Sequence, residues 1–253
     1  NITTSGTQTY TGAVTLSANV ILTTSSDAVT FSSTINSANS TRRNLTINVV
    51  GNSTVITFNG IVGGSNAVGA IAITTGELDL NAAIADATSL VFNGGSNTSN
   101  IGADVTTTGV QTYRHTLISG GARTLEGSTI TFGSSLNGAQ NLTITGNLET
   151  NSIGGSTRIG VFSVSGTANL GGSVLSNGSQ TYSGAVTLSA ASGNYITTSN
   201  DNVTFSSTIE GDGNAPDFLL NTGTGIISIS GAIGGSEALG TLTITQSGGT
   251  TFG

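Results

Sequence analysis

The sequence predicts an all-β fold, a right-handed parallel β-solenoid (β-helix) built from three degenerate super-repeats. Three observations support this prediction: a composition dominated by Gly, Ser, Thr, Asn, Val and Ile, short segments in which apolar and polar residues alternate, and a strong internal repeat. Hydrophobic residues make up 35% of the 253 residues, which is enough for a buried core. The right hand is expected because parallel crossover connections are almost always right-handed.

The internal repeat has three elements, which recur in the same order. The first element begins with Gln-Thr-Tyr, the second has a Phe followed by small hydroxyl residues, and the third is a hydrophobic residue followed by Gly-Gly-Ser. Their positions are QTYTGAVTLSA at 8–18, QTYRHTLIS at 111–119 and QTYSGAVTLSA at 180–190; VTFSSTI at 29–35, ITFGSSL at 130–136 and VTFSSTI at 203–209; and the Gly-Gly-Ser element at 62–65, 153–156 and 233–236. We therefore place the super-repeats at approximately 1–103, 104–172 and 173–253 of a single continuous array, 1–253.

A finer period lies inside each super-repeat. The tyrosine of the first element precedes the phenylalanine of the second by a similar distance in each copy, as from Tyr10 to Phe31 and from Tyr182 to Phe205. This distance is typical of one turn of a solenoid, in which successive turns stack about 4.8 Å apart. The alternative fold is a series of tandem β-sandwich modules of about 100 residues each. Only the separation between Tyr10 and Tyr113 fits that alternative, because the next separation, from Tyr113 to Tyr182, is much shorter.

The strand edges at both ends of such a solenoid are open, and the sequence shows no polar capping segment. Open edges pair with any strand that arrives. We therefore expect flanking copies of the same repeat or of the same chain at both ends, in a head-to-tail assembly.

The succession QTYTGAVTL, VTFSSTI, NLTI, VITFNGIVGG and AVGAIAI is similar to the tandem β-strand repeats of giant bacterial surface proteins of the filamentous-haemagglutinin-like adhesin type. The resemblance covers nearly the whole chain and is weakest in the middle copy. It implies a secreted structural segment of an extracellular fibre or adhesin at the bacterial cell surface, used in attachment, cell aggregation, biofilm or sheath. It implies no catalytic residue and identifies no host, cell-surface or glycan target. The alternative function is a self-assembling head-to-tail subunit of an extracellular filament.

The charge and the composition of the chain argue against several classes of binding partner. Twelve acidic residues stand against five arginines and no lysine, for a net charge of −7, and the only cationic pair is Arg42-Arg43, which we expect in an exposed turn. Nucleic-acid binding is not expected, because contacts to phosphates need clustered cationic side chains. Membrane insertion is not expected either, because no apolar run approaches about 18 residues. The chain has no Cys, so neither disulfides nor thiolate metal sites are available.

A polysaccharide-acting β-helix enzyme is a remote alternative, since glycoside hydrolysis needs two carboxyl groups about 5 to 9.5 Å apart. The best pair is Glu77 and Asp79 in GELDL, which we interpret as the solvent face of a strand whose buried residues are Leu78 and Leu80. The single histidine, His115, has no partner residues for a metal site or a catalytic triad. The sequence therefore predicts that the chain is not an enzyme.

One acidic segment is a weak candidate calcium site. Its oxygen-bearing residues alternate along a glycine-rich bend and are Glu210, Asp212, Asn214 and Asp217. Ca²⁺ prefers oxygen ligands of this kind. The segment matches neither the EF-hand loop nor the glycine-rich nonapeptide, and no other cofactor is expected.

Overall fold

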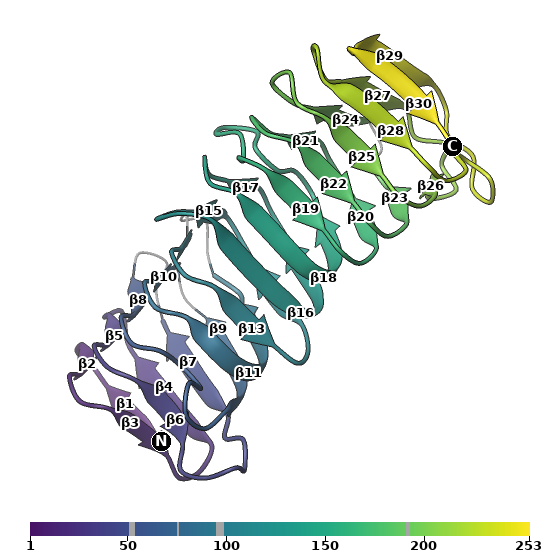
Figure 1. Cartoon of the computed structure of the whole chain (residues 1–253). Coiled ribbons are helices and arrows are strands. Elements are labelled where there is room, and N and C mark those ends of the chain that lie inside the picture. Colours follow the sequence, from purple (N-terminus) through teal and green to yellow (C-terminus); the bar gives the residue numbers. More distant parts are fainter. Residues whose placement is uncertain (51–53, 75, 95–98, 191–192) are drawn as a thin grey trace. The chain divides into compact units, whose positions relative to one another are not determined.

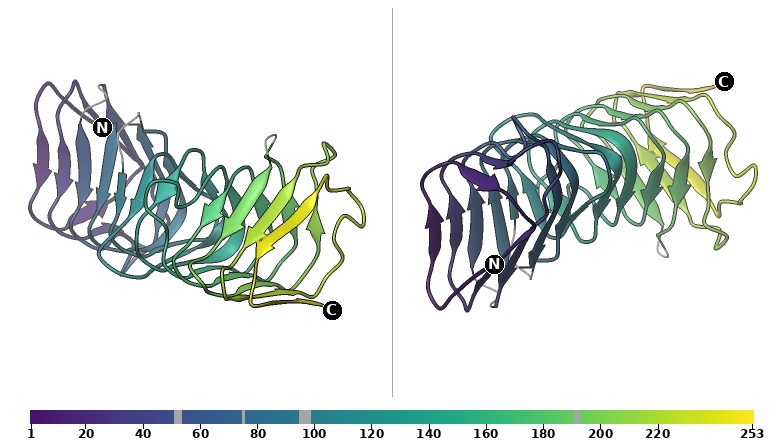
Figure 2. Two further views of the ribbon diagram at one scale, coloured as in Figure 1. Left: turned by 90° about the horizontal axis from the view of Figure 1, so that it is seen from above. Right: turned by 90° about the horizontal axis from the view of Figure 1, so that it is seen from below.

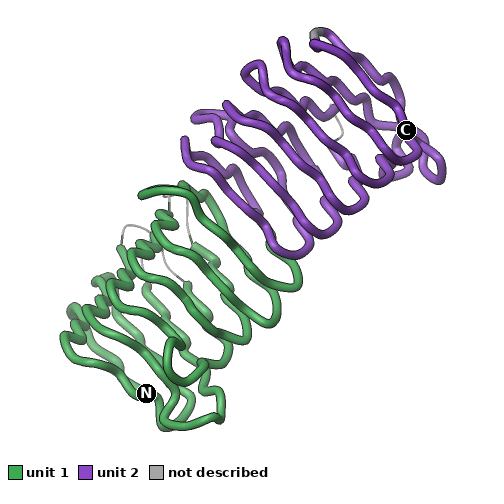
Figure 3. Tube along the Cα trace, in the orientation of Figure 1, with its two compact units in different colours: residues 1–131 green, residues 132–253 purple. Residues whose placement is uncertain are grey.

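The structure, a computed structural model, describes residues 1–50, 54–74, 76–94, 99–190 and 193–253. It forms two compact units, unit 1 from Asn1 to Thr131 and unit 2 from Phe132 to Gly253 (Figure 3). Both units consist of short β-strands joined by tight turns, and the described residues contain no helix (Figure 1). Each unit is described separately below.

Unit 1 winds through three stacks of parallel strands, which we number I to III. Each coil of the chain contributes one segment to each stack in that order (Figure 2). Stack I holds β1 (Ile2–Thr4), β4 (Val20–Thr24), β7 (Leu45–Val49), β9 (Val68–Thr74), the end of β11 (Ile84–Phe92) and β14 (Gln111–Tyr113). Stack II holds β2 (Gln8–Tyr10), β5 (Val29–Phe31), β8 (Val55–Phe58), β10 (Glu77–Leu80), β12 (Ser99–Ile101) and β15 (Thr116–Ile118). Stack III holds β3 (Val14–Leu16), β6 (Ile35–Ser37), Val62, the start of β11, β13 (Val105–Thr107) and β16 (Arg123–Phe132), whose last residue belongs to unit 2.

Unit 2 has the same organisation, with stacks that we number IV to VI. Stack IV holds the start of β18 (Leu142–Thr150), β19 (Phe162–Val164), β22 (Gln180–Tyr182), β25 (Val203–Phe205), β28 (Ile226–Ile229) and β30 (Gly249–Phe252). Stack V holds the end of β18, β20 (Ala168–Leu170), β23 (Val186–Leu188), β26 (Ile209–Glu210) and Ile233. Stack VI holds β17 (Leu136–Asn137), Ile153, β21 (Val174–Leu175), β24 (Asn194–Thr197), β27 (Phe218–Asn221) and β29 (Leu242–Gln246).

The pairing within the stacks confirms the predicted β-solenoid and shows that the β-sandwich alternative is wrong. Every pairing among these stacked strands is parallel, whereas a sandwich of this size is built from antiparallel strands. Paired residues are one coil apart in the sequence, and the coils differ in length: Ser99 pairs with Thr116 across a short coil, and Val29 pairs with Ile56 across a long one. The predicted turn from Tyr10 to Phe31 is confirmed, because these two residues are direct partners. The right-handed winding of the solenoid and the boundaries of the super-repeats stay predictions.

The core of each unit is filled by the inward residues of its strands. Strands such as β5 and β7 alternate buried and partly exposed positions, as the sequence predicts. Aromatic rings at equivalent positions stack along the coil axis: the ring centroids of Tyr10 and Phe31 lie 5.0 Å apart and those of Phe31 and Phe58 lie 5.2 Å apart, with nearly parallel planes. Tyr182 and Phe205 repeat this arrangement in unit 2, at 5.1 Å. The Gln-Thr-Tyr element therefore begins an aromatic stack that the Phe of the second element continues.

Each Gln-Thr-Tyr element also places a polar pair inside the core. The Tyr182 hydroxyl donates to Gln180 Oε1 at 2.8 Å, and Gln180 Nε2 donates to the carbonyl oxygen of Thr197 at 3.1 Å. The same two bonds occur in the other copies, from Tyr113 to Gln111 to Glu126 O and from Tyr10 to Gln8 to Thr23 O. Burial raises the pKa of Tyr113 and of Tyr182 far above the ordinary value, so both hydroxyls stay protonated donors. Each glutamine thus adds a side-chain donor to a backbone carbonyl 15 or 17 residues further along the chain, and Thr197 O also accepts the Ser176 N–H.

Replacing Tyr182 with Phe should cost more stability than replacing Tyr10 with Phe. Tyr182→Phe leaves the buried Gln180 Oε1 without its donor, which should lower the free energy of unfolding by about 1–3 kcal/mol. Tyr10 is only partly buried, so water can replace its hydroxyl and the loss should be about 1 kcal/mol or less. Urea unfolding followed by circular dichroism measures both, and an equal effect of the two substitutions would contradict this account.

Asn and Asp side chains connect consecutive coils at the corners. In each case the residue directly precedes a position that is aligned with the inward-facing residues of its stack, and its Oδ1 accepts the backbone N–H of the equivalent residue one coil later. Among the described residues, eight such bonds of 2.7–3.1 Å occur: Asn1 to Ile21, Asn19 to Asn44, Asn44 to Ala70, Asp104 to Thr124, Asn141 to Val161, Asn147 to Thr167, Asn202 to Ile226 and Asp217 to Thr241. We call these bonds the coil caps. They satisfy N–H donors at positions where the ladder to the previous coil has not yet begun, because that ladder starts one residue later.

Glycines make room for several of the coil caps. Gly160 precedes Val161, the donor to Asn141, and a Cβ atom on Gly160 would collide with Asn141 Oδ1. Gly69 stands in the same relation to Asn44, and the Gly160 N–H itself donates to the carbonyl of Gln140 at 2.9 Å. These glycines are therefore needed for close approach between coils.

Removing one coil cap should destabilise unit 2 measurably. Asn141→Ala removes the acceptor of the Val161 N–H, and we expect the free energy of unfolding to fall by about 1 kcal/mol. Asn141→Asp keeps an acceptor oxygen at that position and should stay close to the wild type. Urea unfolding of both variants tests the cap, and an Asn141→Asp variant as unstable as Asn141→Ala would contradict it.

The Gly-Gly-Ser element forms a corner that is held by the second element of the previous coil. Gly63 has a φ of 75° and donates its N–H to the carbonyl of Ile35 at 2.8 Å. The N–H groups of Ser65 and Asn66, which follow Gly64, both donate to Asn36 Oδ1, at 2.9 and 3.2 Å. The corners at 153–156 and 233–236 repeat these bonds, with Asn137 Oδ1 and Glu210 Oε2 as the acceptors. The order of the second and third elements in the sequence therefore encodes one hydrogen-bonded corner across two coils.

The copies of the repeat do not occupy the same stack. Within unit 1, the first Gln-Thr-Tyr strand, β2, lies in stack II, whereas the second, β14, lies in stack I five coils after β1. The distance from Tyr10 to Tyr113 is therefore about four and two-thirds coils on the coil spacing of these stacks. Each copy keeps the same order of strands and corners, although the first two copies begin in different stacks.

Candidate functional site

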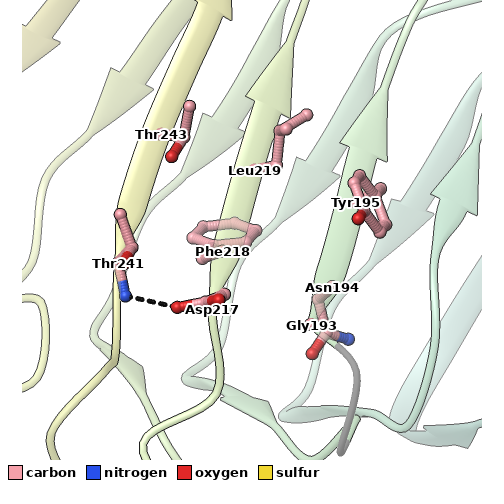
Figure 4. Close-up of a pocket in the computed structure, with 8 residues that line it drawn as sticks. All are labelled: Gly193, Asn194, Tyr195, Asp217, Phe218, Leu219, Thr241 and Thr243. Atoms are coloured by element: carbon pink, nitrogen blue, oxygen red, sulfur yellow. Dashed lines mark hydrogen bonds between the residues drawn. The ribbon is translucent and has the colours of Figure 1, made fainter.

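Two adjoining hollows mark the outer surface of unit 2 and are the candidate functional site. The first, which we call the strand hollow, has a volume of about 220 Å³ and is lined by Gly193, Asn194, Tyr195, Asp217, Phe218, Leu219, Thr241 and Thr243 (Figure 4). The second, the loop hollow, has a volume of about 580 Å³ and is lined by Ser189, Ala190, Gly193, Asp212, Asn214, Ala215, Pro216 and Asp217. The two share Gly193 and Asp217.

The strand hollow is built on the outer face of stack VI. The register pairs Asn194 with Phe218 and Phe218 with Leu242, and these inward residues fill the core. The outward residues on either side of them form two rows, Gly193, Asp217 and Thr241 in one and Tyr195, Leu219 and Thr243 in the other (Figure 4). Asp217 is held in place by its coil cap, in which Oδ1 accepts the Thr241 N–H at 2.7 Å.

The structure separates the four predicted calcium residues. Asp212, Asn214 and Asp217 all line the loop hollow, whereas Glu210 does not. Glu210 Oε2 accepts the N–H groups of Ser236 and Glu237, each at 3.0 Å, so Glu210 is the counterpart of Asn36 and Asn137 in the Gly-Gly-Ser corner. Within the described ranges, no group of three or more His, Cys, Asp or Glu side chains is placed to hold a metal ion. Calcium binding stays a prediction, and the residues brought together for it are the three around the loop hollow.

Asp212 is stabilised as a carboxylate by its neighbour in the bend. The side chain of Asn214 donates to Asp212 Oδ2 and its backbone N–H donates to Oδ1, both at 3.1 Å. These bonds lower the pKa of Asp212 below the ordinary value for an aspartate. The loop hollow therefore carries negative charge at neutral pH.

The pair Glu77 and Asp79 lies where the sequence predicts, on the outer face of β10, with Leu78 and Leu80 buried. Asp79 is part of a hydrogen-bonded row across several coils of stack II. Its two carboxylate oxygens accept the side-chain amides of Asn81 and Asn100, at 3.0 and 2.9 Å. The row continues from Asn81 to Asn59 and from Asn100 to Ser119. Asp79 is thus bound to neutral amides in a row that links neighbouring coils.

His115 lies at the turn between β14 and β15 and has a φ of 45°. Two residues separate Tyr113 from Thr116 there, whereas three separate Tyr10 from Val14 in the first copy. The left-handed conformation of His115 compensates for the shorter turn. Its carbonyl oxygen accepts the N–H of Ser99 at 2.7 Å, which ties the turn to the neighbouring coil.

The expectation that Arg42-Arg43 lies in an exposed turn is wrong in one respect. Both residues are partly buried, and Arg42 Nη1 lies 2.8 Å from Asp86 Oδ1 and donates to the carbonyl of Val68. This ion pair joins two segments that lie two coils apart, and Val68 belongs to the coil between them. The cationic pair therefore supports the packing of the coils.

Sequence reasoning missed the strand hollow. Tyr195 occupies an outward position in a strand, where the alternation of residues gives no indication of a site. Two observations in the sequence point to it: Tyr195 is an aromatic residue in a polar position, and Gly193 stands two residues before it. Because Gly193 has no side chain, the space between Tyr195 and Asp217 stays open.

No protein-family model matches this chain, and no curated protein or solved structure is significantly similar to it. In addition, none of the described segments forms a helix long and apolar enough to cross a membrane. The resemblance to adhesin repeats therefore stays a prediction from the sequence motifs.

A titration and a pair of substitutions separate the structural role of Glu210 from calcium binding. Glu210→Gln keeps an acceptor for the two N–H groups of the corner and should melt like the wild type, whereas Glu210→Ala should lose about 1 kcal/mol of stability. The calcium hypothesis predicts heat on calorimetric titration with CaCl₂ that persists in Glu210→Gln and is lost in Asp212→Asn. A wild-type protein that gives no heat and no melting shift with CaCl₂ would contradict it.

Proposed function

We propose that this chain is a structural repeat segment of a bacterial extracellular surface fibre of the adhesin type, and that it acts by spacing and bearing load rather than by catalysis. The observation that supports this proposal is what the three copies of the repeat have in common. They share the Gln-Tyr pair, whose glutamine amide binds a carbonyl 15 or 17 residues later, and the Gly-Gly-Ser corner, which is bound to the previous coil. A repeat whose recurring residues are used for stacking is suited to building length.

The composition of the chain supports an extracellular setting. The chain has no Cys and no Lys and carries a net charge of −7. Its coils are joined by neutral amide side chains and glycines, so their cohesion depends little on ion pairs that salt would screen. Such cohesion suits a protein exposed to a medium of changing ionic strength.

The partner that we propose is another copy of the repeat, stacked on the first coil. The first coil leaves an apolar hollow of about 180 Å³, lined by Ile2, Tyr10, Val14, Thr15, Leu16, Val20, Leu22, Phe31 and Leu45. Ile2 is 43% exposed there. A further coil placed on this surface would bury it and would extend the parallel stacks.

Immunogold labelling of intact cells that produce the protein tests the proposed function. Antibody raised against the purified chain should label the surface of cells that have not been permeabilised, and the matched control is labelling by antibody against a cytosolic protein. Label that appears only after permeabilisation would contradict the proposal.

Negative-stain electron microscopy of the purified chain distinguishes the two forms of the proposal. Separate particles favour a segment of a larger fibre, and long fibres favour the alternative, a self-assembling filament subunit.

A further inference from the structure

We infer that the strand hollow of unit 2 is a binding site for a neutral pyranose sugar, with the Tyr195 ring and Leu219 as the platform and Asp217 as the hydrogen-bonding group. The inference is independent of the proposed function, since it rests on the six outward residues of stack VI. Among the described residues the most exposed aromatic side chains are Tyr195 and Phe252, and Tyr195 lines the strand hollow.

The first step is the exposure of Tyr195. Of the four tyrosines, Tyr113 and Tyr182 are fully buried and Tyr10 is partly buried, whereas Tyr195 is 46% exposed. Its strand partner on the next coil is Leu219, so the ring and the leucine form an apolar strip between the polar residues Asp217 and Thr243. An exposed aromatic ring beside an aliphatic side chain is a surface that gains free energy when an apolar ligand face covers it.

The second step is the hollow beside that strip. Gly193 is two residues before Tyr195 and is aligned with Asp217 on the next coil, because Asn194 pairs with Phe218. Gly193 has a φ of 89° and no side chain, so the space bounded by the Tyr195 ring and the Asp217 carboxylate stays open (Figure 4). Its volume of about 220 Å³ is below the range of about 300–1,000 Å³ for sites of drug-sized ligands. The hollow therefore suits one small ring.

The third step is the chemistry of the walls. Asp217 uses one carboxylate oxygen for the Thr241 N–H, and the hydroxyls of Thr241 and Thr243 lie on the far side of the hollow. These groups accept and donate hydrogen bonds at the rim, while the strip of Tyr195 and Leu219 is apolar. A pyranose ring has the matching character, with a face of C–H groups and hydroxyls around its edge.

The charge of the site selects against anionic sugars. Asp212 and Asp217 stand in the two adjoining hollows, and no Lys or Arg lines either of them. A carboxylated or sulfated sugar would be repelled by these carboxylates. A cationic ligand would be attracted by them, but a point charge makes no use of the extended apolar strip, so the neutral sugar is the occupant that fits the whole site.

Saturation-transfer difference NMR on the purified full chain tests the inference. The probes are cellotetraose, maltotetraose and N-acetylchitotetraose, each in buffer with EDTA so that calcium does not contribute. At least one probe should show saturation transfer to ring protons. Tyr195→Ala should weaken the binding of that probe at least tenfold, and Asp217→Asn, which keeps an acceptor oxygen for the Thr241 N–H, should weaken it severalfold.

Two controls keep the result interpretable. Ile226→Ala removes another exposed apolar residue, 47% exposed on stack IV of the same unit, and should leave sugar binding unchanged. Circular dichroism should show that each variant keeps the fold of the wild type. The inference is overturned if none of the three sugars binds, if Tyr195→Ala binds as tightly as Ile226→Ala, or if tetra-arginine binds at Tyr195 while the sugars do not.

Discussion

The structure depends on one constraint, which is that every coil must satisfy the backbone groups of its neighbour at the corners as well as in the strands. Strand ladders pair the backbone along the faces, but they stop where the chain turns. At those points the previous coil supplies an acceptor, as Asn141 does for Val161 and Asn36 does for Ser65. The constraint also accounts for the composition. Asn provides a neutral acceptor and Gly allows the close approach, so few charged residues are needed.

The fold could be predicted from the sequence because similar residues recur at about the spacing of one coil. Tyr10 and Phe31 are recognisable as equivalent, and they are partners in the structure. The coil caps could not be predicted, because the distance between acceptor and donor follows the local coil length. It is 26 residues from Asn44 to Ala70 but 20 residues from Asn141 to Val161. Only the register of the strands shows that these bonds occupy equivalent positions in their coils.

Part of the candidate site could be predicted from the sequence and part of it could not. Glu210 belongs to an acidic segment of the sequence, yet it occupies the position of Asn36 and Asn137, directly after the second element of the repeat. The hydrogen bonds of the three corners, and not the acidic segment, therefore define the role of Glu210. The space beside Tyr195 was not accessible in the same way, because it is bounded by residues of neighbouring coils, Gly193 and Asp217, whose alignment depends on the register.

The first and second Gln-Thr-Tyr strands lie in different stacks of unit 1, and this offset has a consequence for how such arrays lengthen. Each copy carries its own strands and its own corner. It therefore needs a neighbouring coil to pair with, but it does not have to begin in a particular stack. A duplicated gene segment therefore does not have to encode a whole number of coils to be accommodated.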